Sequence, residues 1–349
     1  MFNALLEDMA RQVKDKWKQK RYGIQLTDTG IDHRTNLRFA DDVLLFANTL
    51  PQIQTMIADL QEVSKASGLL LHPDKTKILA NATHKTGRPR RTHVDIYGMK
   101  VEVLDLTEST KYLGRLIGFE RPHDDELENR IRQAWKTFMS NKHELTGKRY
   151  TLRNRLRLFD GVVTPSMLYG SACWCLTKDL QTKMKRTQWK MLRMVLGSGR
   201  RRARQPAHAA DSSATTDSSS NAESSIVDDS LVPWQDWIRR TTREAEAQLN
   251  KYDLTDWTVA WRRKVWQWAG RAARFDKTRW AWRALIWQPS TSLRAKGRRP
   301  AGLRKRWSDD IVHFLKAKGL ETCHANWFQC AVGADQWQAW EEEFCTRSE

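Results

Sequence analysis

Two adjacent carboxylates, Asp41 and Asp42, are the residues of this sequence whose chemistry is easiest to interpret. They interrupt the largely apolar segment Leu37-Arg38-Phe39-Ala40-Asp41-Asp42-Val43-Leu44-Leu45-Phe46-Ala47, which predicts a strand, a tight turn and a second strand. Because Asp tolerates turn geometry, we expect both carboxylates to be exposed at a hairpin tip. Carboxylates that both stay ionised side by side usually share a cation, and Mg²⁺ prefers such oxygen ligands. The pair would suit two-metal phosphoryl transfer; the alternative is a solvated turn without function.

The segments around this hairpin must hold it in place. Apolar residues spaced by three and four predict one helix over 1–20 and a second over 51–66, capped by Thr49 and ended by Gly68. Short strands are expected over 69–71 and 77–80, a hairpin over 94–104, and one further strand over 110–117. We therefore predict an α+β fold class, with an antiparallel sheet that carries helices on one face.

The second half of the chain is predicted to be helical and basic. Apolar stripes predict helices between Asp124 and Gly199, and residues 141–210 carry 16 Lys or Arg against 3 Asp or Glu. This surplus suits a surface that follows phosphates. Residues 211–230 contain no Lys or Arg and show no periodicity, which predicts a flexible acidic linker. The basic run Arg200, Arg201, Arg202 before it is either a phosphate-binding or nuclear-import patch or the solvated end of the linker.

Tryptophan dominates the sequence after the linker. Thirteen of the 17 tryptophans lie from Trp234 onward, and we expect most of them to form a small helical core. The alternative is that exposed rings stack on bases while arginines bind phosphates. A basic loop follows, in which we single out the nucleic-acid-binding candidates Arg298, Arg299, Arg304, Lys305 and Arg306. Asp309 and Asp310 after this loop are expected to begin a helix rather than to bind a metal.

Net charge and cysteine usage narrow the class of protein. The 349 residues carry a formal net charge of +19, which predicts a polyanionic partner, with nucleic acid ahead of an anionic membrane. The sequence contains neither an apolar run of the roughly 20 residues that span a bilayer nor a signal-peptide pattern. Five cysteines without framework spacing agree with a reducing compartment. We expect a soluble intracellular protein, in which the cysteines after residue 320 are thiols rather than zinc ligands.

Three motifs in register resemble those of reverse transcriptases, particularly those of non-LTR (LINE-type) retrotransposons. Phe39-Ala40-Asp41-Asp42 resembles the polymerase motif. The segment 68–77 resembles the next palm motif, although His72 stands where the family usually has Asn. Lys111-Tyr112-Leu113-Gly114 then resembles the Tyr-Leu-Gly of the primer grip. The resemblance implies a partial palm over 1–120, a helical thumb-like region over 121–205, a disordered linker over 206–232 and a Trp-rich basic helical extension over 233–349.

The resemblance also implies a reaction and the residues that perform it. The family reaction is RNA-directed DNA polymerisation by two-metal nucleotidyl transfer, with an RNA template and a DNA primer, or their duplex, as partners. Asp41 and Asp42 would bind Mg²⁺, and Lys75 would protonate the pyrophosphate leaving group, unless it is a plain surface lysine. Tyr112, Leu113 and Gly114 would position the primer end.

The sequence departs from the family in one respect that bears on activity. The family places its fingers and its first catalytic aspartate well upstream of the hairpin, and neither is expected here. Asp8, Asp15, Asp28 and Asp32 are not suitable replacements, since two lie on the polar side of a helix and two in a turn. We therefore expect that the chain does not polymerise by itself. The alternatives are a non-catalytic nucleic-acid-binding remnant and a longer reading frame that encodes the missing parts.

Overall fold

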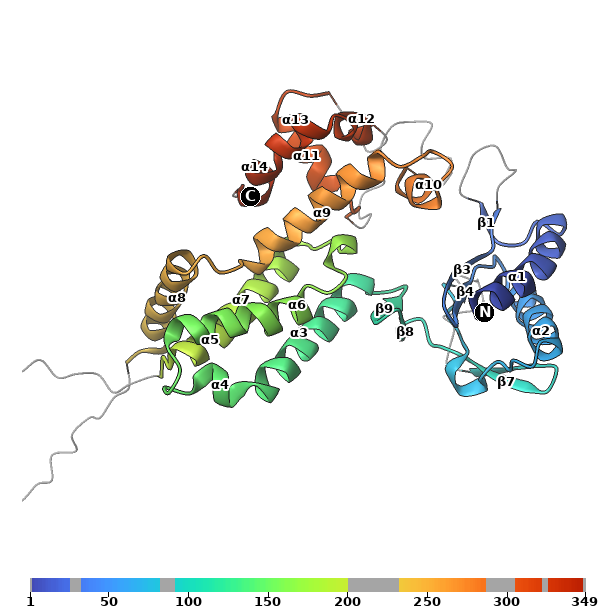
Figure 1. Cartoon of the computed structure of the whole chain (residues 1–349), viewed down its shortest axis with the longest axis horizontal. Coiled ribbons are helices and arrows are strands. Elements are labelled where there is room, and N and C mark those ends of the chain that lie inside the picture. The colour runs from blue at the N-terminus through green and yellow to red at the C-terminus, as the bar shows by residue number, and fades with distance from the viewer. Residues whose placement is uncertain are drawn as a thin grey trace, which may run out of the picture. The chain divides into compact units, whose positions relative to one another are not determined.

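The computed structural model describes most of the chain, in several stretches (Figure 1). The described residues are 2–25, 33–81, 92–199, 232–286, 305–321 and 326–347. They group into two units, of which the first comprises Met1–Arg130, Leu168–Gln181 and Val259–Glu349 and the second Ile131–Met167 and Thr182–Thr258. The fold class is α+β, as predicted. The predicted domain boundaries stay predictions, and the linker from 206 to 231 lies outside the described residues.

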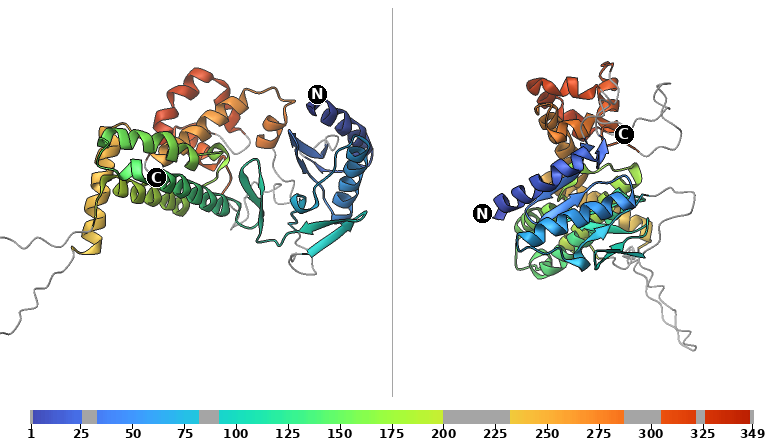
Figure 2. Two further views of the ribbon diagram at one scale, coloured as in Figure 1. Left: turned by 60° about the horizontal axis from the view of Figure 1, so that its bottom comes forward. Right: turned by 90° about the vertical axis from the view of Figure 1, so that its right-hand side faces the viewer.

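Two helices at the start of unit 1 pack against each other (Figure 2). They are α1 (Phe2–Gln19) and α2 (Leu50–Ala66), and both predicted helices are thus confirmed. As expected, the Thr49 side chain caps α2 by accepting a hydrogen bond from the Gln52 amide, and Gly68 follows its end at φ +76°. The apolar faces of the two helices meet at Trp17 and Met56, which are buried.

A buried carboxylate fixes the register between these two helices. Asp59 of α2 accepts a hydrogen bond from Trp17 Nε1 at 2.9 Å and forms an ion pair with Lys16. The carboxylate is 8% exposed, whereas the lysine side chain keeps 47% of its surface in solvent. The hydrogen bond to the indole therefore contributes more to the register than the ion pair does, because exposed charge is screened by water.

The predicted aspartate hairpin is present and lies on this helical pair. Strand β3 (Asn36–Phe39) pairs with β4 (Asp42–Leu45) in antiparallel register, and Phe39 faces Asp42 across a two-residue turn. Leu45 packs into both apolar clusters of this region, one around Trp17 and one around Ile57. A second, shorter pair, β1 (Ile24–Gln25) with β2 (His33–Arg34), precedes it.

The next sheet differs in detail from the prediction. Its strands are β5 (Lys77–Ile78), β7 (Met99–Val103) and β6 (Thr92–Ile96), in that order. The hairpin of β6 and β7 confirms the predicted one, but β5 runs parallel to β7. The strand predicted over 69–71 is wrong. That segment has no strand partner and leaves Leu70 82% exposed, before Pro73 starts the 3₁₀ turn η1 (Pro73–Lys75).

The single strand predicted over 110–117 is in fact a hairpin. It consists of β8 (Ser109–Tyr112) and β9 (Arg115–Gly118), joined by the two-residue turn Leu113-Gly114. Both turn residues have positive φ, +48° and +76°, as a type I′ turn requires. The prediction failed because Leu113 is not a residue that usually adopts this conformation.

Tryptophans form the core of the C-terminal part of unit 1, as predicted. Trp266 and Trp337 stack with ring centroids 3.6 Å apart, and each indole donates a hydrogen bond to the backbone carbonyl of the other residue. The helices that carry this core are α9 (Trp257–Ala273), α10 (Trp280–Ile286), α11 (Asp309–Ala317), α12 (Trp327–Val332), α13 (Ala334–Ala339) and α14 (Glu341–Thr346). Burial raises the pKa of the Cys345 thiol in this core to about 12.

Unit 2 is helical, as predicted for this part of the chain. Its core contains a stack of Phe159 on Trp257, with centroids 5.9 Å apart, and the Trp257 indole donates to the Thr164 hydroxyl at 2.9 Å. The helices that contribute to it are α3 (Pro122–Ser140), α4 (Lys142–Thr146), α5 (Leu152–Leu158), η2 (Phe159–Val163), α6 (Thr164–Met167), α7 (Lys178–Leu196) and α8 (Trp234–Lys251). Within the described stretches, no helix combines the length and the apolar character that a membrane span requires.

The Asp59 contact yields a stability prediction. Asp59→Ala leaves the buried Trp17 indole without its acceptor, so it should lower the free energy of unfolding by about 1–3 kcal/mol. Asp15→Ala, an exposed aspartate of the same helix pair, is the control and should change it little. Urea unfolding, with amide exchange in α1 and α2 as a local probe, measures both. If both substitutions lowered the free energy of unfolding equally, the stabilising role of the Asp59–Trp17 hydrogen bond would be contradicted.

Candidate active site

The carboxylates of Asp41 and Asp42 lie exposed at the tip of the β3–β4 hairpin, as predicted. The turn residue Ala40 has φ +51°, an uncommon conformation for a residue with a side chain, and such conformations are frequent at functional sites. Arg38 at the base of the tip donates hydrogen bonds to the Glu7 carboxylate at 2.9 Å and to the Leu6 carbonyl at 3.2 Å. This guanidinium lowers the pKa of Glu7. Helix α1 therefore holds the hairpin that presents the two aspartates.

Two neighbouring, solvent-accessible carboxylates can supply oxygen ligands to a hard cation such as Mg²⁺. Among the described residues, no group of three His, Cys, Asp or Glu side chains could together hold a metal. Asp8 and Asp15 are exposed on α1, and the segment that contains Asp28 and Asp32 lies outside the described residues. The two carboxylates at the tip are therefore suitable ligands for a divalent cation. A complete coordination sphere for two metals needs further ligands.

Lys75, the candidate general acid, is exposed at the end of η1. It lies on a different element from the aspartate hairpin, and its role stays a prediction.

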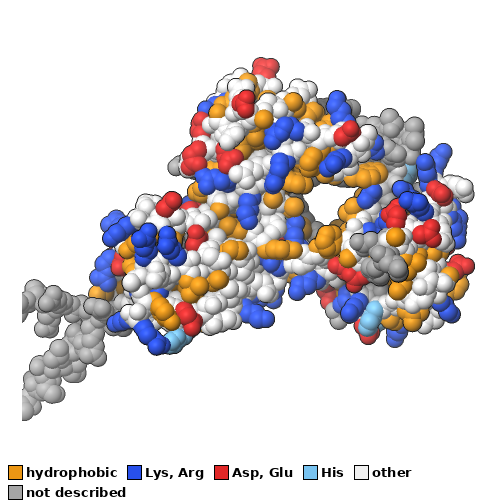
Figure 3. Space-filling view, in the orientation of Figure 1, with side chains coloured by type: hydrophobic (Ala, Val, Ile, Leu, Met, Phe, Trp, Pro, Cys, Tyr) orange, Lys and Arg blue, Asp and Glu red, His pale blue; other side chains and the backbone are white. Residues whose placement is uncertain are grey.

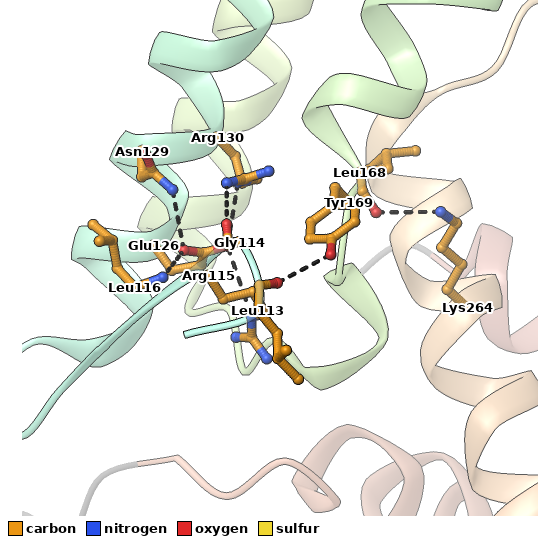
Figure 4. Close-up of polar contacts among 10 residues, drawn as sticks. All are labelled: Leu113, Gly114, Arg115, Leu116, Glu126, Asn129, Arg130, Leu168, Tyr169 and Lys264. Atoms are coloured by element: carbon orange, nitrogen blue, oxygen red, sulfur yellow. Dashed lines mark hydrogen bonds and ion pairs between the residues drawn. The ribbon is translucent and has the colours of Figure 1, made fainter. Parts of the chain in front are cut away.

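The β8–β9 hairpin contains the candidate primer-grip residues. Tyr112 is the last residue of β8, and Leu113 and Gly114 form the turn. Figure 4 shows that both carbonyl groups of the turn are held by side chains. The Tyr169 hydroxyl donates to the Leu113 carbonyl at 3.0 Å, and Arg130 Nη2 donates to the Gly114 carbonyl at 2.6 Å. The turn is therefore held by side chains of Tyr169 and Arg130, which do not belong to the hairpin.

A buried carboxylate holds the strand that follows this turn. Glu126 of α3 is fully buried and accepts a hydrogen bond from the Leu116 amide at 2.7 Å (Figure 4). Its other oxygen lies 3.3 Å from Arg130 Nε and 3.7 Å from Arg115 Nε. Two guanidinium groups thus compensate one buried negative charge, which would otherwise be costly to remove from water. The same contacts direct Arg130 toward the Gly114 carbonyl.

Tyr112 connects the two hairpins electrostatically. Partial burial raises the pKa of the Tyr112 phenol, and the nearby Asp42 carboxylate raises it further. An ionised phenol would be repelled by that carboxylate, so the neutral form is favoured. The Tyr112 phenol and the Asp42 carboxylate therefore interact electrostatically.

Sequence reasoning missed three residues of this site: Glu126, Arg130 and Tyr169. The spacing of Glu126 and Arg130 by four residues is the usual spacing of a helical ion pair, but it does not reveal that the pair is buried. Tyr169 lies in the region over 121–205, for which the sequence predicted only a helical, thumb-like structure. Its contact with residues more than fifty positions earlier in the chain could not be read from local spacing.

Of the basic residues predicted to bind nucleic acid, the structure describes only two. Arg200, Arg201, Arg202, Arg298, Arg299 and Arg304 lie outside the described residues. Lys305 is engaged within the chain, since its ammonium group donates to the Leu176 carbonyl and pairs with Asp310, both within 2.8 Å. The Arg306 amide donates to the Asp309 carboxylate at 2.8 Å. Asp309 and Asp310 thus begin α11 and hold the segment before it, as expected.

A comparison with known protein families finds a match in the part of the chain that carries the two hairpins. Residues 1–117 match the sequence model of the family described as reverse transcriptase (RNA-dependent DNA polymerase). This part of the chain is a reverse-transcriptase segment. The segment includes the aspartate hairpin and the Tyr-Leu-Gly turn, and it ends within β9.

A transposon-derived protein of Caenorhabditis elegans extends the likeness beyond the reverse-transcriptase segment. It is 27% identical over 286 residues, which cover 79% of this chain and 84% of that protein. No solved structure matches the chain. The relative therefore resembles the chain over residues well past 117, where the family model ends.

The Tyr-Leu-Gly turn of the reverse-transcriptase segment yields a second prediction. Gly114 combines a φ of +76° with a position at which an added Cβ would lie 3.2 Å from Tyr169 Cε1. Gly114→Ala should therefore destabilise the hairpin by about 1–2 kcal/mol, measured by thermal unfolding and by amide exchange in β8 and β9. Gly161→Ala is the control, since an added Cβ there meets no atom within 4 Å. If both substitutions destabilised the protein equally, the claim that Tyr169 and the positive φ of Gly114 constrain this turn would be wrong.

Proposed function

We propose that this chain contributes the aspartate pair and the primer grip of a non-LTR retrotransposon reverse transcriptase, whose reaction is RNA-directed DNA polymerisation. The observation that carries the proposal is the exposed Asp41-Asp42 tip within the matched segment 1–117, which also contains the Tyr-Leu-Gly turn. A polymerase needs carboxylates near the reacting phosphate and a separate element that holds the primer end. The two hairpins supply one of these functions each.

The roles proposed for the residues follow from their chemistry. Asp41 and Asp42 would hold Mg²⁺, which when bound neutralises charge on the reacting phosphates. Lys75 is exposed and could protonate the pyrophosphate leaving group. The described residues provide two carboxylates at this place. We therefore infer that the chain polymerises only when a further ligand comes from outside them.

Basic helices of unit 2 support a nucleic-acid substrate. Figure 3 shows Lys and Arg side chains over α8 and the helices beside it, and Arg239, Arg240 and Arg243 of α8 are exposed. Other exposed basic residues of this unit are Arg153 and Arg157 on α5 and Lys183, Arg186 and Lys190 on α7. Each phosphate that such groups neutralise releases counterions, so binding of an RNA–DNA duplex should weaken steeply with salt.

A non-catalytic nucleic-acid-binding protein is the competing function. It is favoured by the two-carboxylate geometry, because a duplex-binding surface would need neither a metal nor a complete cage. Salt-dependent binding is expected under both functions, so it cannot separate them. Metal-dependent extension of a primer can.

Primer extension on an RNA template with Mg²⁺ tests the proposal. The chain is assayed alone and together with a polypeptide that supplies the fingers and the first-aspartate strand of a related reverse transcriptase. We expect extension in the complemented reaction and at least a hundredfold loss, roughly the scale of a removed charge-stabilising group, in Asp41→Asn/Asp42→Asn. Asp15→Asn, an exposed aspartate elsewhere on the segment, is the matched control and should leave extension unchanged.

The outcome that would overturn the enzyme proposal is equally specific. It is the absence of extension in both reactions, together with tight duplex binding that Asp41→Asn/Asp42→Asn does not alter. That result would leave the binding protein as the function.

A further inference from the structure

We propose that Tyr169 is a positioning residue of the primer grip, which holds the Leu113–Gly114 peptide so that its N–H faces a phosphate of the primer strand. The proposal rests on the proposed polymerase function. Tyr169 lies outside the segment that matches the reverse-transcriptase family, and it touches the turn through its side chain. It would act on the primer only through the backbone that it holds.

The two segments interlock at a pair of glycines. An added Cβ on Gly114 would lie 3.2 Å from the Tyr169 ring, and one on Gly170 would lie 2.8 Å from Arg115 Cδ. Each glycine therefore admits a side chain of the opposite segment, and both have positive φ. This reciprocal close approach fixes the position of the Tyr169 ring as well as that of its hydroxyl.

The hydroxyl holds the central peptide of the turn by its carbonyl group. Type I′ and type II′ turns differ by a flip of this peptide, which reverses the sign of φ at the second turn residue. Gly114 has φ +76°, so the turn is of type I′ and the Leu113 carbonyl points toward Tyr169. Because the N–H of a trans peptide points opposite to its carbonyl, the Gly114 N–H faces away from Tyr169. Loss of the hydroxyl would remove the hydrogen bond that holds this peptide and would loosen it, while Leu113 at the first turn position itself favours type I′ over type II′.

Arg130 supports the tyrosine from the other side. Its guanidinium lies 5.2 Å from the centroid of the Tyr169 ring and donates to the Gly114 carbonyl. The buried Glu126 carboxylate holds that guanidinium in place. Two successive carbonyls of the turn thus accept hydrogen bonds from the protein, and the amide between them is the group that remains directed to a ligand. A backbone N–H is a good donor to a phosphate oxygen.

The test replaces only the hydroxyl. In Tyr169→Phe the ring still packs on Gly114 and under Arg130, so the fold should be retained. Tyr150→Phe is the matched control, since Tyr150 is 42% exposed and Tyr169 50%. Two quantities are measured: the preference of the protein for an RNA–DNA duplex with a recessed primer 3′ end over a blunt duplex of the same sequence, and conformational exchange of the Gly114 amide by NMR relaxation dispersion.

We expect the wild-type protein and Tyr150→Phe to prefer the duplex with the recessed primer end and to show no conformational exchange at the Gly114 amide. Tyr169→Phe should lose about three- to tenfold of that preference, the range of one hydrogen bond, and should show exchange at Gly114, with unchanged affinity for the blunt duplex. A merely structural role would weaken binding to both duplexes equally.

The results that count against the proposal can be told apart. If wild type prefers the recessed end and Tyr169→Phe keeps that preference, the positioning role is overturned while the polymerase function stands. If wild type shows no preference at all, the proposed function fails, and the positioning of a primer fails with it.

Discussion

The carboxylate of Glu126 is the interaction on which the rest of the site depends. It is fully buried, and it is compensated by Arg115, Arg130 and the Leu116 amide. Removing one partner of such a buried ion pair typically costs about 3–5 kcal/mol, so strand β9, helix α3 and the turn between β8 and β9 are held as one piece. The turn can therefore keep a conformation that Leu113, at φ +48°, would not adopt readily without support.

The reverse-transcriptase segment presents two hairpin turns that differ in what they expose. The tip of β3 and β4 exposes carboxylates, which suit a cation. The turn of β8 and β9 has its carbonyls engaged by Tyr169 and Arg130, and in the proposed primer grip its Gly114 amide faces a phosphate. The Asp42 carboxylate raises the pKa of the Tyr112 phenol, so these two side chains interact electrostatically. Under the proposed function, the metal-binding and phosphate-binding groups come from separate hairpins, each held by its own helix.

Part of this arrangement was predictable from the sequence because it is encoded locally. The apolar spacing of α1 and α2, the Thr49 cap and the Asp41-Asp42 tip follow from residues within one or two turns of each other, and the buried tryptophans follow from their size. The strand predicted over 110–117 was wrong because its conformation depends on Tyr169 and Arg130, which act from distant elements. The parallel pairing of β5 with β7 and the three short helices at the C-terminal end likewise depend on packing rather than on local pattern.

One measurement tests most directly whether the two turns form a single site. Mn²⁺, a paramagnetic ion that carboxylates also bind, is titrated into the protein while backbone amide signals are followed by NMR. We predict that Mn²⁺ broadens the amides of Ala40 to Val43 together with those of Tyr112 to Arg115, and that Asp41→Asn/Asp42→Asn abolishes both effects. Broadening that spares Tyr112 to Arg115, or that persists in the double variant, would contradict the single site.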